Sequence, residues 1–176
     1  GELQEEFWPR LYIAPASICT GTGAISKAKS KGWFDDLPEG SFPCSPADAE
    51  KLKAQTKNLL ANADVRCLLE ERQDAEFNVR WKWNGHDVRS RVDGSTSTHF
   101  YDWKTTREPD PTPYNWYRTV LKFNYHLQAA MYGNAQQAMF GFERRMRFIV
   151  ISTTFPYECC VVKLPHRLIQ QGRDEC

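Results

Sequence analysis

Apolar and polar residues alternate through the stretch EFNVRWKW, in which the apolar positions are Phe77, Val79, Trp81 and Trp83. A period of two is typical of a β-strand with one buried face. Asn84-Gly85 follows directly, and this dipeptide is the strongest short signal for a tight β-hairpin turn. The pattern therefore predicts two antiparallel strands that meet at this turn, with a valine-rich second strand that ends near Asp93.

Helical signals precede the hairpin. Ser45 suits a helix N-cap and Pro46 the first helical position, and leucines at helical spacing carry the helix to about Asn62. A second short helix is expected over residues 65–71. Residues 1–44 contain several glycines and prolines and little periodicity, so they are expected to be irregular, with one short helix over about 24–31.

The pattern after the hairpin predicts further strands and one long helix. A third strand is expected over about 99–105, and three alternating prolines from Pro109 to Pro113 then form an extended connector. A long helix should follow over about 115–140. The stretches RFIVISTT and YECCVVKL are predicted to be strands. This order of elements predicts an α+β domain.

Composition narrows the class of protein. The 176 residues suit one domain, and 41% hydrophobic with 26% charged residues is ordinary globular usage. No apolar run could span a bilayer and no leader is recognisable, so we expect a cytoplasmic protein with no membrane association. The six cysteines show no metal-binding spacing. Because the net charge is only +1, any contact with nucleic acid must be local.

Three charged residues lie close together on the second and third strands. Asp102 and Lys104 are two residues apart, so their side chains share one strand face, and the short turn brings Asp93 to the same end of the sheet. Two adjacent carboxylates repel unless a hard cation such as Mg²⁺ joins them. Taken alone, Asp93 could be a turn aspartate, and Asp102 with Lys104 an ordinary ion pair.

Asp93 followed by Asp102-Trp103-Lys104 resembles the signature of the PD-(D/E)XK nucleases, with Val92 where the family name has proline. The stretch YHLQAAMY resembles the Q-x-x-x-Y element of the RecB-like branch and supplies Gln128 and Tyr132, which lie one helical turn apart. The sequence from DWKTTREPD to YHLQAAMY is most similar to that of the RecE-type exonucleases, exodeoxyribonuclease VIII and its phage relatives.

The resemblance implies a restriction-endonuclease-like core, in which a central mixed sheet of three antiparallel strands and further strands is flanked by helices. The single nuclease domain would cover residues 1–176, with residues 45–176 as the core. The family pattern implies that Asp93 and Asp102 bind Mg²⁺, with Mn²⁺ as a substitute, and that Lys104 assists the attacking water. Gln128 and Tyr132 would position the strand or the lysine.

The implied activity is a metal-dependent exodeoxyribonuclease that digests linear double-stranded DNA in phage-type recombination or repair. A homo-oligomer and a single-strand annealing protein are further implied partners. Two alternatives stay open, a catalytically inactive DNA-binding module and an endonuclease on the same scaffold. Relatives carry an upstream histidine that completes the metal site, whereas the first histidine here is His86, in the hairpin turn.

Further residues are candidates for supporting roles. Glu76 and Tyr125 could support the site, and Arg91 is expected to pair with Asp93. Arg89 could hold DNA phosphates or pair with Asp93, and Thr105, Thr106 and Arg107 could contact the DNA backbone or simply form the exit of the strand.

Two groups of residues are assigned structural roles. Trp103 alternates away from the site and is expected in the core. The basic residues of FERRMR, which are Arg144, Arg145 and Arg147, are expected at a solvated helix end.

Overall fold

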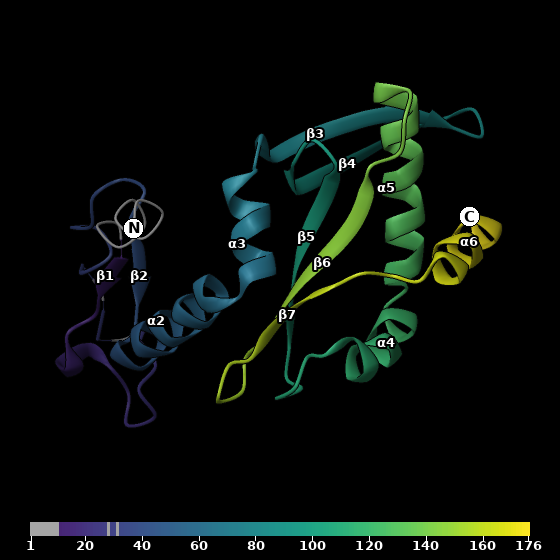
Figure 1. Ribbon diagram of the computed structural model, residues 1–176. Helices are drawn as coiled ribbons and strands as arrows, with labels where there is room; N and C mark the ends of the chain where they lie inside the picture. The colour runs from purple at the N-terminus through teal and green to yellow at the C-terminus, as the bar shows by residue number, and fades with distance from the viewer. Residues whose placement is uncertain (1–10, 28, 31) are drawn as a thin grey trace. The chain divides into compact units, whose positions relative to one another are not determined.

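The computed structural model describes residues 11–27, 29–30 and 32–176 (Figure 1). Its contacts divide the chain into two compact units, Gly1–Thr56 and Lys57–Cys176. Every residue that the sequence proposes for the site lies in the second unit.

The first unit contains a small parallel pair of strands. β1 (Leu11–Ile13) pairs with β2 (Phe42–Cys44), and a single 3-10 turn, η2 (Ala16–Ile18), lies between them. The short helix expected over 24–31 is wrong for its described residues, which form turns and one isolated bridge between Cys19 and Ile25. Positive φ angles at Gly23 and Gly32, on either side of this stretch, favour turns over a continuing helix.

Two helices precede the main sheet, as the sequence predicts. α2 (Pro46–Ala61) begins after Ser45, whose Oγ accepts a hydrogen bond from the Asp48 backbone N–H at 3.1 Å. α3 (Ala63–Glu70) follows at once, because the Asn62 side chain accepts from two backbone N–H groups of its first turn. One asparagine thus separates the two helices.

The second unit is built on a five-stranded mixed sheet in the order β3-β4-β5-β6-β7. β5 and β6 are parallel, and the other neighbours are antiparallel. The predicted hairpin is confirmed, with Trp83 opposite His86 across the Asn84-Gly85 turn. The strands are β3 (Asp74–Trp83), β4 (His86–Ser95), β5 (His99–Thr106), β6 (Arg145–Ser152) and β7 (Cys159–Val162).

The long helix predicted over 115–140 is wrong as a single element. It is two helices, α4 (Pro113–Lys122) and α5 (Tyr125–Phe140), because Asn124 adopts a left-handed conformation with φ 56°. Asparagine tolerates that conformation better than most residues. A further helix, α6 (His166–Glu175), was not predicted from the sequence, and it packs closely on α5, where a Cβ at Gly172 would overlap the His126 carbonyl oxygen.

Helices flank the sheet on both faces (Figure 1). On one face α4, α5 and α6 bury an apolar cluster that includes Val79, Phe100, Trp116, Phe148 and Leu168. On the other face α3 places Val65 and Leu68 against the sheet in a smaller cluster. The α+β class with a central mixed sheet flanked by helices is therefore confirmed.

Two structural assignments from the sequence are wrong. Trp103 is 37% exposed, because it lies outside the small cluster that α3 covers. Arg144 is not at a solvated helix end. Its guanidinium carbon lies 4.5 Å from the centre of the Phe140 ring, it donates to the Thr96 carbonyl, and β6 begins at the next residue.

Candidate active site

The two aspartates lie where β4 and β5 separate. The hydrogen-bonded ladder between these strands contains Gly94 opposite Tyr101 and Ser95 opposite Phe100, and it extends no further. The next position in that register places Asp93 opposite Asp102. Asp93 Oδ2 accepts a hydrogen bond from the Trp103 backbone N–H at 2.8 Å, so a carboxylate takes the place of a ladder carbonyl.

A glycine is required at the end of this ladder. The Tyr101 ring lies across Gly94, and a Cβ added there would overlap the ring. The close approach of ring and backbone keeps the last paired position compact just before the strands separate.

Asp102 is the buried polar centre of the site, with 4% of its surface exposed. Its Oδ1 accepts from Gln128 Nε2 at 2.7 Å, and its Oδ2 is paired with the Lys104 ammonium. Burial raises the pKa of Asp102, while the bond from Lys104 opposes that rise and the charge of Asp93 adds to it. A positive charge close to both aspartates would therefore relieve an unfavourable environment.

The Lys104 ammonium, which pairs with this carboxylate, also lies over two aromatic rings. Its ammonium lies 4.6 Å from the centre of the Tyr125 ring and 5.6 Å from that of Phe148. An ammonium over the face of an aromatic ring is attracted by the ring quadrupole, so these contacts help to hold Lys104 beside Asp102. Tyr125 was proposed as a supporting residue, whereas Phe148 was missed, although its place beside Asp102 in the parallel register explains its role.

Gln128 and Tyr132 join α5 to the strands of the site. They lie one turn apart, with Gln128 Nε2 3.3 Å from the Tyr132 hydroxyl oxygen, and that hydroxyl donates to the Arg91 carbonyl at 2.9 Å. Burial raises the pKa of Tyr132, which keeps the hydroxyl protonated as a donor. The structure thus brings together all five residues that the sequence proposed: Asp93, Asp102, Lys104, Gln128 and Tyr132.

The donor chemistry fits a hard divalent cation. Asp93 and Asp102 offer carboxylate oxygens on opposite sides of the strand separation, and Mg²⁺ commonly uses one or two protein carboxylates and completes its shell with water and substrate oxygens. Among the described residues, no cluster of three or more His, Cys, Asp or Glu side chains could hold a metal. His86 is exposed at the hairpin turn.

The pairing predicted between Arg91 and Asp93 is wrong. Arg91 pairs with Glu76 instead, at 2.5 Å, while Asp93 is bonded to the Trp103 backbone. Glu76 has a positive φ of 53°, and the ladder between β3 and β4 skips it. A non-glycine residue in that conformation is strained, and such strain gathers at functional sites.

The residues that follow Lys104 lie at the exit of β5. Thr105 and Arg107 are exposed and Thr106 is half-buried. The carbonyl of Thr106 accepts from the Thr153 N–H at 2.7 Å, and that of Arg107 accepts from Thr154 Oγ1 at 2.9 Å. These bonds fix the backbone of the strand exit.

The sequence also left Arg80 unremarked. It is exposed on β3 and lies directly opposite Arg89, the arginine of β4 proposed to contact DNA. The register that the Asn84-Gly85 turn imposes was the signal that could have found it.

The sheet, the opposed aspartates and the lysine two residues beyond the second aspartate define a restriction-endonuclease-like domain. The chain belongs to the family described as a PDDEXK-like domain of unknown function (DUF3799), whose model matches residues 52–176. That match covers well over half of the chain and includes every residue of the site.

Comparison with solved structures supports the same fold. The chain is similar to the crystal structure of a protein from Eubacterium rectale described as a candidate exonuclease, with a TM-score of 0.63 and 9% sequence identity. The similarity covers 84% of this chain and 56% of that one, so the chain spans little more than half of that protein's length.

No curated protein matches the chain. Within the described ranges, no helix is long and apolar enough to cross a membrane.

Proposed function

We propose that this protein is a metal-dependent deoxyribonuclease, and more narrowly an exonuclease that digests linear double-stranded DNA. The observation that carries the proposal is the buried Asp102 carboxylate, held between Lys104 and Gln128 with Asp93 at the opposed position. An ordinary ion pair on a strand does not need a buried carboxylate, because burying a charge is costly, and it does not need a hydrogen bond from a helix glutamine.

Each side chain has a defined task in this proposal. Asp93 and Asp102 would hold Mg²⁺, or Mn²⁺ as a substitute, and the ion would supply charge neutralisation at the phosphate and an acidified water. The Lys104 ammonium orients the attacking water or neutralises charge that develops on the phosphate. Gln128 fixes the Asp102 carboxylate, and Tyr132 fixes α5 against the backbone of β4.

The finer assignments extend the same proposal. The exit of β5, with Thr105, Thr106 and Arg107, and Arg89 on β4 would contact the DNA backbone. Membership of the RecE-type branch, 5′-to-3′ digestion, a cytoplasmic role in phage-type recombination or repair, a homo-oligomer and an annealing partner are proposed from the resemblance. The Eubacterium rectale protein, described as a candidate exonuclease, supports the exonuclease over the endonuclease.

A second candidate is a DNA-binding module without turnover. The observation that favours it is the ligand set, because among the described residues no group of three or more His, Cys, Asp or Glu side chains could hold a metal ion. The two candidates agree on the partner and differ in whether the phosphodiester bond is hydrolysed.

A digestion assay separates the candidates. The full chain is incubated with linear and with covalently closed circular duplex DNA of the same sequence, in Mg²⁺, in Mn²⁺ and in chelator. Loss of linear DNA alone, only with metal, is the expected result. Cutting of both substrates identifies an endonuclease. Metal-dependent binding with no cutting of either substrate overturns the enzymatic proposal in favour of the module.

A further inference from the structure

One face of the β3–β4 hairpin carries a row of charged residues that leads to the site. Because side chains alternate along a strand, Arg89 and Arg91 share a face of β4 with Asp93. The register adds the residues of β3 that lie opposite them on the same face. The pairs, from the hairpin turn inwards, are Lys82 with Asp87, Arg80 with Arg89, and Asn78 with Arg91.

Two acidic residues of this face, Asp87 and Glu76, are already in ion pairs, and a third, Asp93, accepts a hydrogen bond from the Trp103 backbone N–H. Asp87 forms an ion pair with Lys82 at 2.9 Å, and Glu76 forms one with Arg91. Neither Arg80 nor Arg89 makes an ion pair with another described residue. Like charges directly opposite one another destabilise an antiparallel pair of strands. The sheet therefore carries an uncompensated double positive charge that its own packing does not explain.

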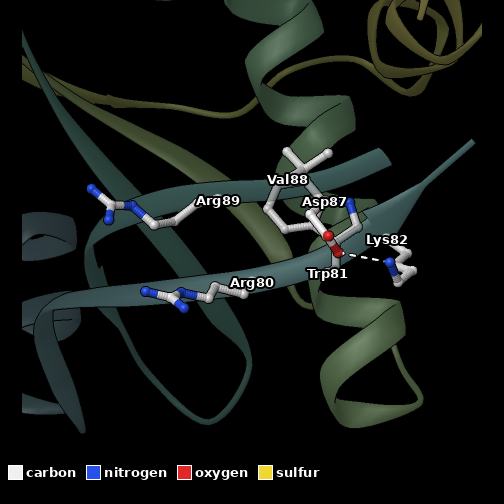
Figure 2. A pocket seen from close by; sticks show the side chains of 6 residues that line it. All are labelled: Arg80, Trp81, Lys82, Asp87, Val88 and Arg89. Carbon is white, nitrogen blue, oxygen red and sulfur yellow. Dashed lines mark ion pairs between the residues drawn. The ribbon is translucent and has the colours of Figure 1, made fainter. Parts of the chain in front are cut away.

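The two arginines line a concave surface. A groove of about 680 Å³ is bordered by both arginines and by the residues next to them toward the turn. Figure 2 shows the Arg80 and Arg89 side chains side by side, both extended away from the Lys82–Asp87 ion pair. Both residues are exposed, so their guanidinium donors face solvent.

We propose that Arg80 and Arg89 form a phosphate clamp that grips the DNA backbone at a distance from the cleavage site. Guanidinium groups present planar donor forks that match phosphate oxygens, and two forks side by side suit a polyanion. Arg89 lies four residues from Asp93 on one strand, which is roughly 13 Å. The clamp would hold phosphates a few nucleotides away from the scissile one.

Charge complementarity favours a nucleic-acid backbone as the occupant. The whole chain carries a net charge of only +1, so affinity for DNA must come from concentrated positive groups. The groove lies along the hairpin from the two arginines toward the turn, and on β4 the same strand face continues from Arg89 through Arg91 to Asp93. A free phosphate ion would make the same guanidinium bonds, and competition distinguishes the two sources.

This inference rests on the proposed function for its substrate and adds a prediction of its own. Each neutralised phosphate contributes about −0.9 to the slope of log K against log salt. Loss of two contacts should lower the magnitude of the slope by about 1.8 and weaken binding by roughly tenfold or more at 0.1 M salt. Because the clamp acts on bound DNA generally, KM should rise while kcat stays unchanged.

The test compares the wild type with Arg80→Gln/Arg89→Gln in the full chain. Fluorescence anisotropy with labelled linear duplex is measured over a salt series without metal, and melting temperature confirms folding. Arg167→Gln, an exposed arginine on α6, removes charge elsewhere and should change the slope by less than one. Arg80→Lys/Arg89→Lys keeps the charge and should keep most of the slope.

The outcomes are distinct from those of the cleavage assay. An unchanged slope in a folded double Gln variant that still binds and cuts DNA overturns the clamp alone. A reduced slope in a protein that never cuts DNA supports the clamp and overturns the enzyme. Failure of the wild type to bind DNA overturns both. Displacement of DNA by millimolar inorganic phosphate in the wild type would identify a small-anion site and overturn the backbone assignment.

Discussion

The floor of the candidate site, formed by Asp93 and Asp102, and the exposed face of the β3–β4 hairpin both use residues of β4. They differ in how their charged groups are compensated. At the floor, Asp102 is buried and each of its carboxylate oxygens has a protein partner. Four residues from Asp93 along β4, Arg89 faces Arg80 in solvent and neither has an acidic partner among the described residues. One region satisfies its charges within the protein, and the other presents them outward.

The difference separates two requirements of a nuclease. Groups that stabilise a transition state must be fixed before the substrate arrives, and burial with complete hydrogen bonding fixes them. Groups that hold a long polyanion need to reach many phosphates, and exposed side chains do so at little cost in desolvation. Changes at the floor should therefore alter turnover, and changes on the hairpin should alter affinity.

The largest expected effect is at Lys104. Lys104→Ala should bind Mn²⁺ and linear DNA nearly as wild type does but lower kcat by about 10²-fold or more, because a preorganised charge at the reacting phosphate is lost. Steady-state digestion and anisotropy measure the two quantities. Lys122→Ala, at the end of α4, is the matched control and should behave as wild type. Normal turnover by Lys104→Ala would contradict the catalytic role assigned to Lys104.

Metal binding tests the two opposed aspartates. Isothermal calorimetry of the wild type with Mn²⁺ should show heat of binding that Asp102→Ala loses, because the buried carboxylate is the better fixed ligand. Bound metal should also stabilise the wild type by RT ln(1 + [L]/Kd), so its melting temperature should rise with the logarithm of the metal concentration once that exceeds Kd. Asp74→Ala, an exposed aspartate that begins β3, should retain the heat. Equal heats in wild type and Asp102→Ala would remove the metal assignment.

Gln128 should show an intermediate effect. Gln128→Ala removes the helix donor that orients Asp102, and loss of such a supporting bond typically costs about 10- to 100-fold in metal affinity or activity. Gln128→Glu places a carboxylate beside Asp102 and should not restore function. Gln170→Ala, exposed on α6, controls for loss of a helix glutamine. Metal titration of the cleavage rate distinguishes weaker metal binding from slower chemistry.

The smallest effect concerns a half-buried thiol on β7, an edge strand of the sheet. Burial raises the pKa of Cys160 to about 12, and its thiol donates to the Pro111 carbonyl at 2.7 Å. Because the folded pKa lies above that of an unfolded thiol, the native state keeps its proton and loses stability as the pH rises from about 9 toward 12. At pH 8, mass spectrometry should find exposed Cys67 and Cys176 alkylated well before Cys160. Equal labelling rates would contradict the burial.

The sequence predicted those features that depend on local periodicity. Alternation with Asn84-Gly85 located the hairpin, and the spacing of Gln128 and Tyr132 placed both on one face of a helix. It missed the break at Asn124, since asparagine is compatible with both a helix and a left-handed turn. Registers between distant strands are set by packing that no short window contains.

The choice of partner for Arg91 shows the same limit at one residue. Alternation places Asp93 on the same face of β4 as Arg91, and Glu76 lies on the neighbouring strand β3. Arg91 pairs with Glu76, because the Asp93 carboxylate accepts a hydrogen bond from the Trp103 backbone N–H where β4 and β5 separate. That separation is a tertiary feature and leaves no mark in the spacing of the residues.

The parallel pairing of β5 with β6 also determines at what stage of synthesis the site can form. β5 is joined to β4 over a short ladder only, whereas it is paired with β6 along its whole length, from His99 opposite Arg145 to Thr106 opposite Ser152. A ribosome adds the intervening residues in roughly several seconds. During that interval the nascent chain can fold its hairpin and already contains both aspartates, yet the strand with Asp102 and Lys104 has no parallel neighbour to hold it. If the protein is the nuclease proposed above, hydrolysis is expected only after β6 has emerged, which separates synthesis of the chain from the onset of its chemistry.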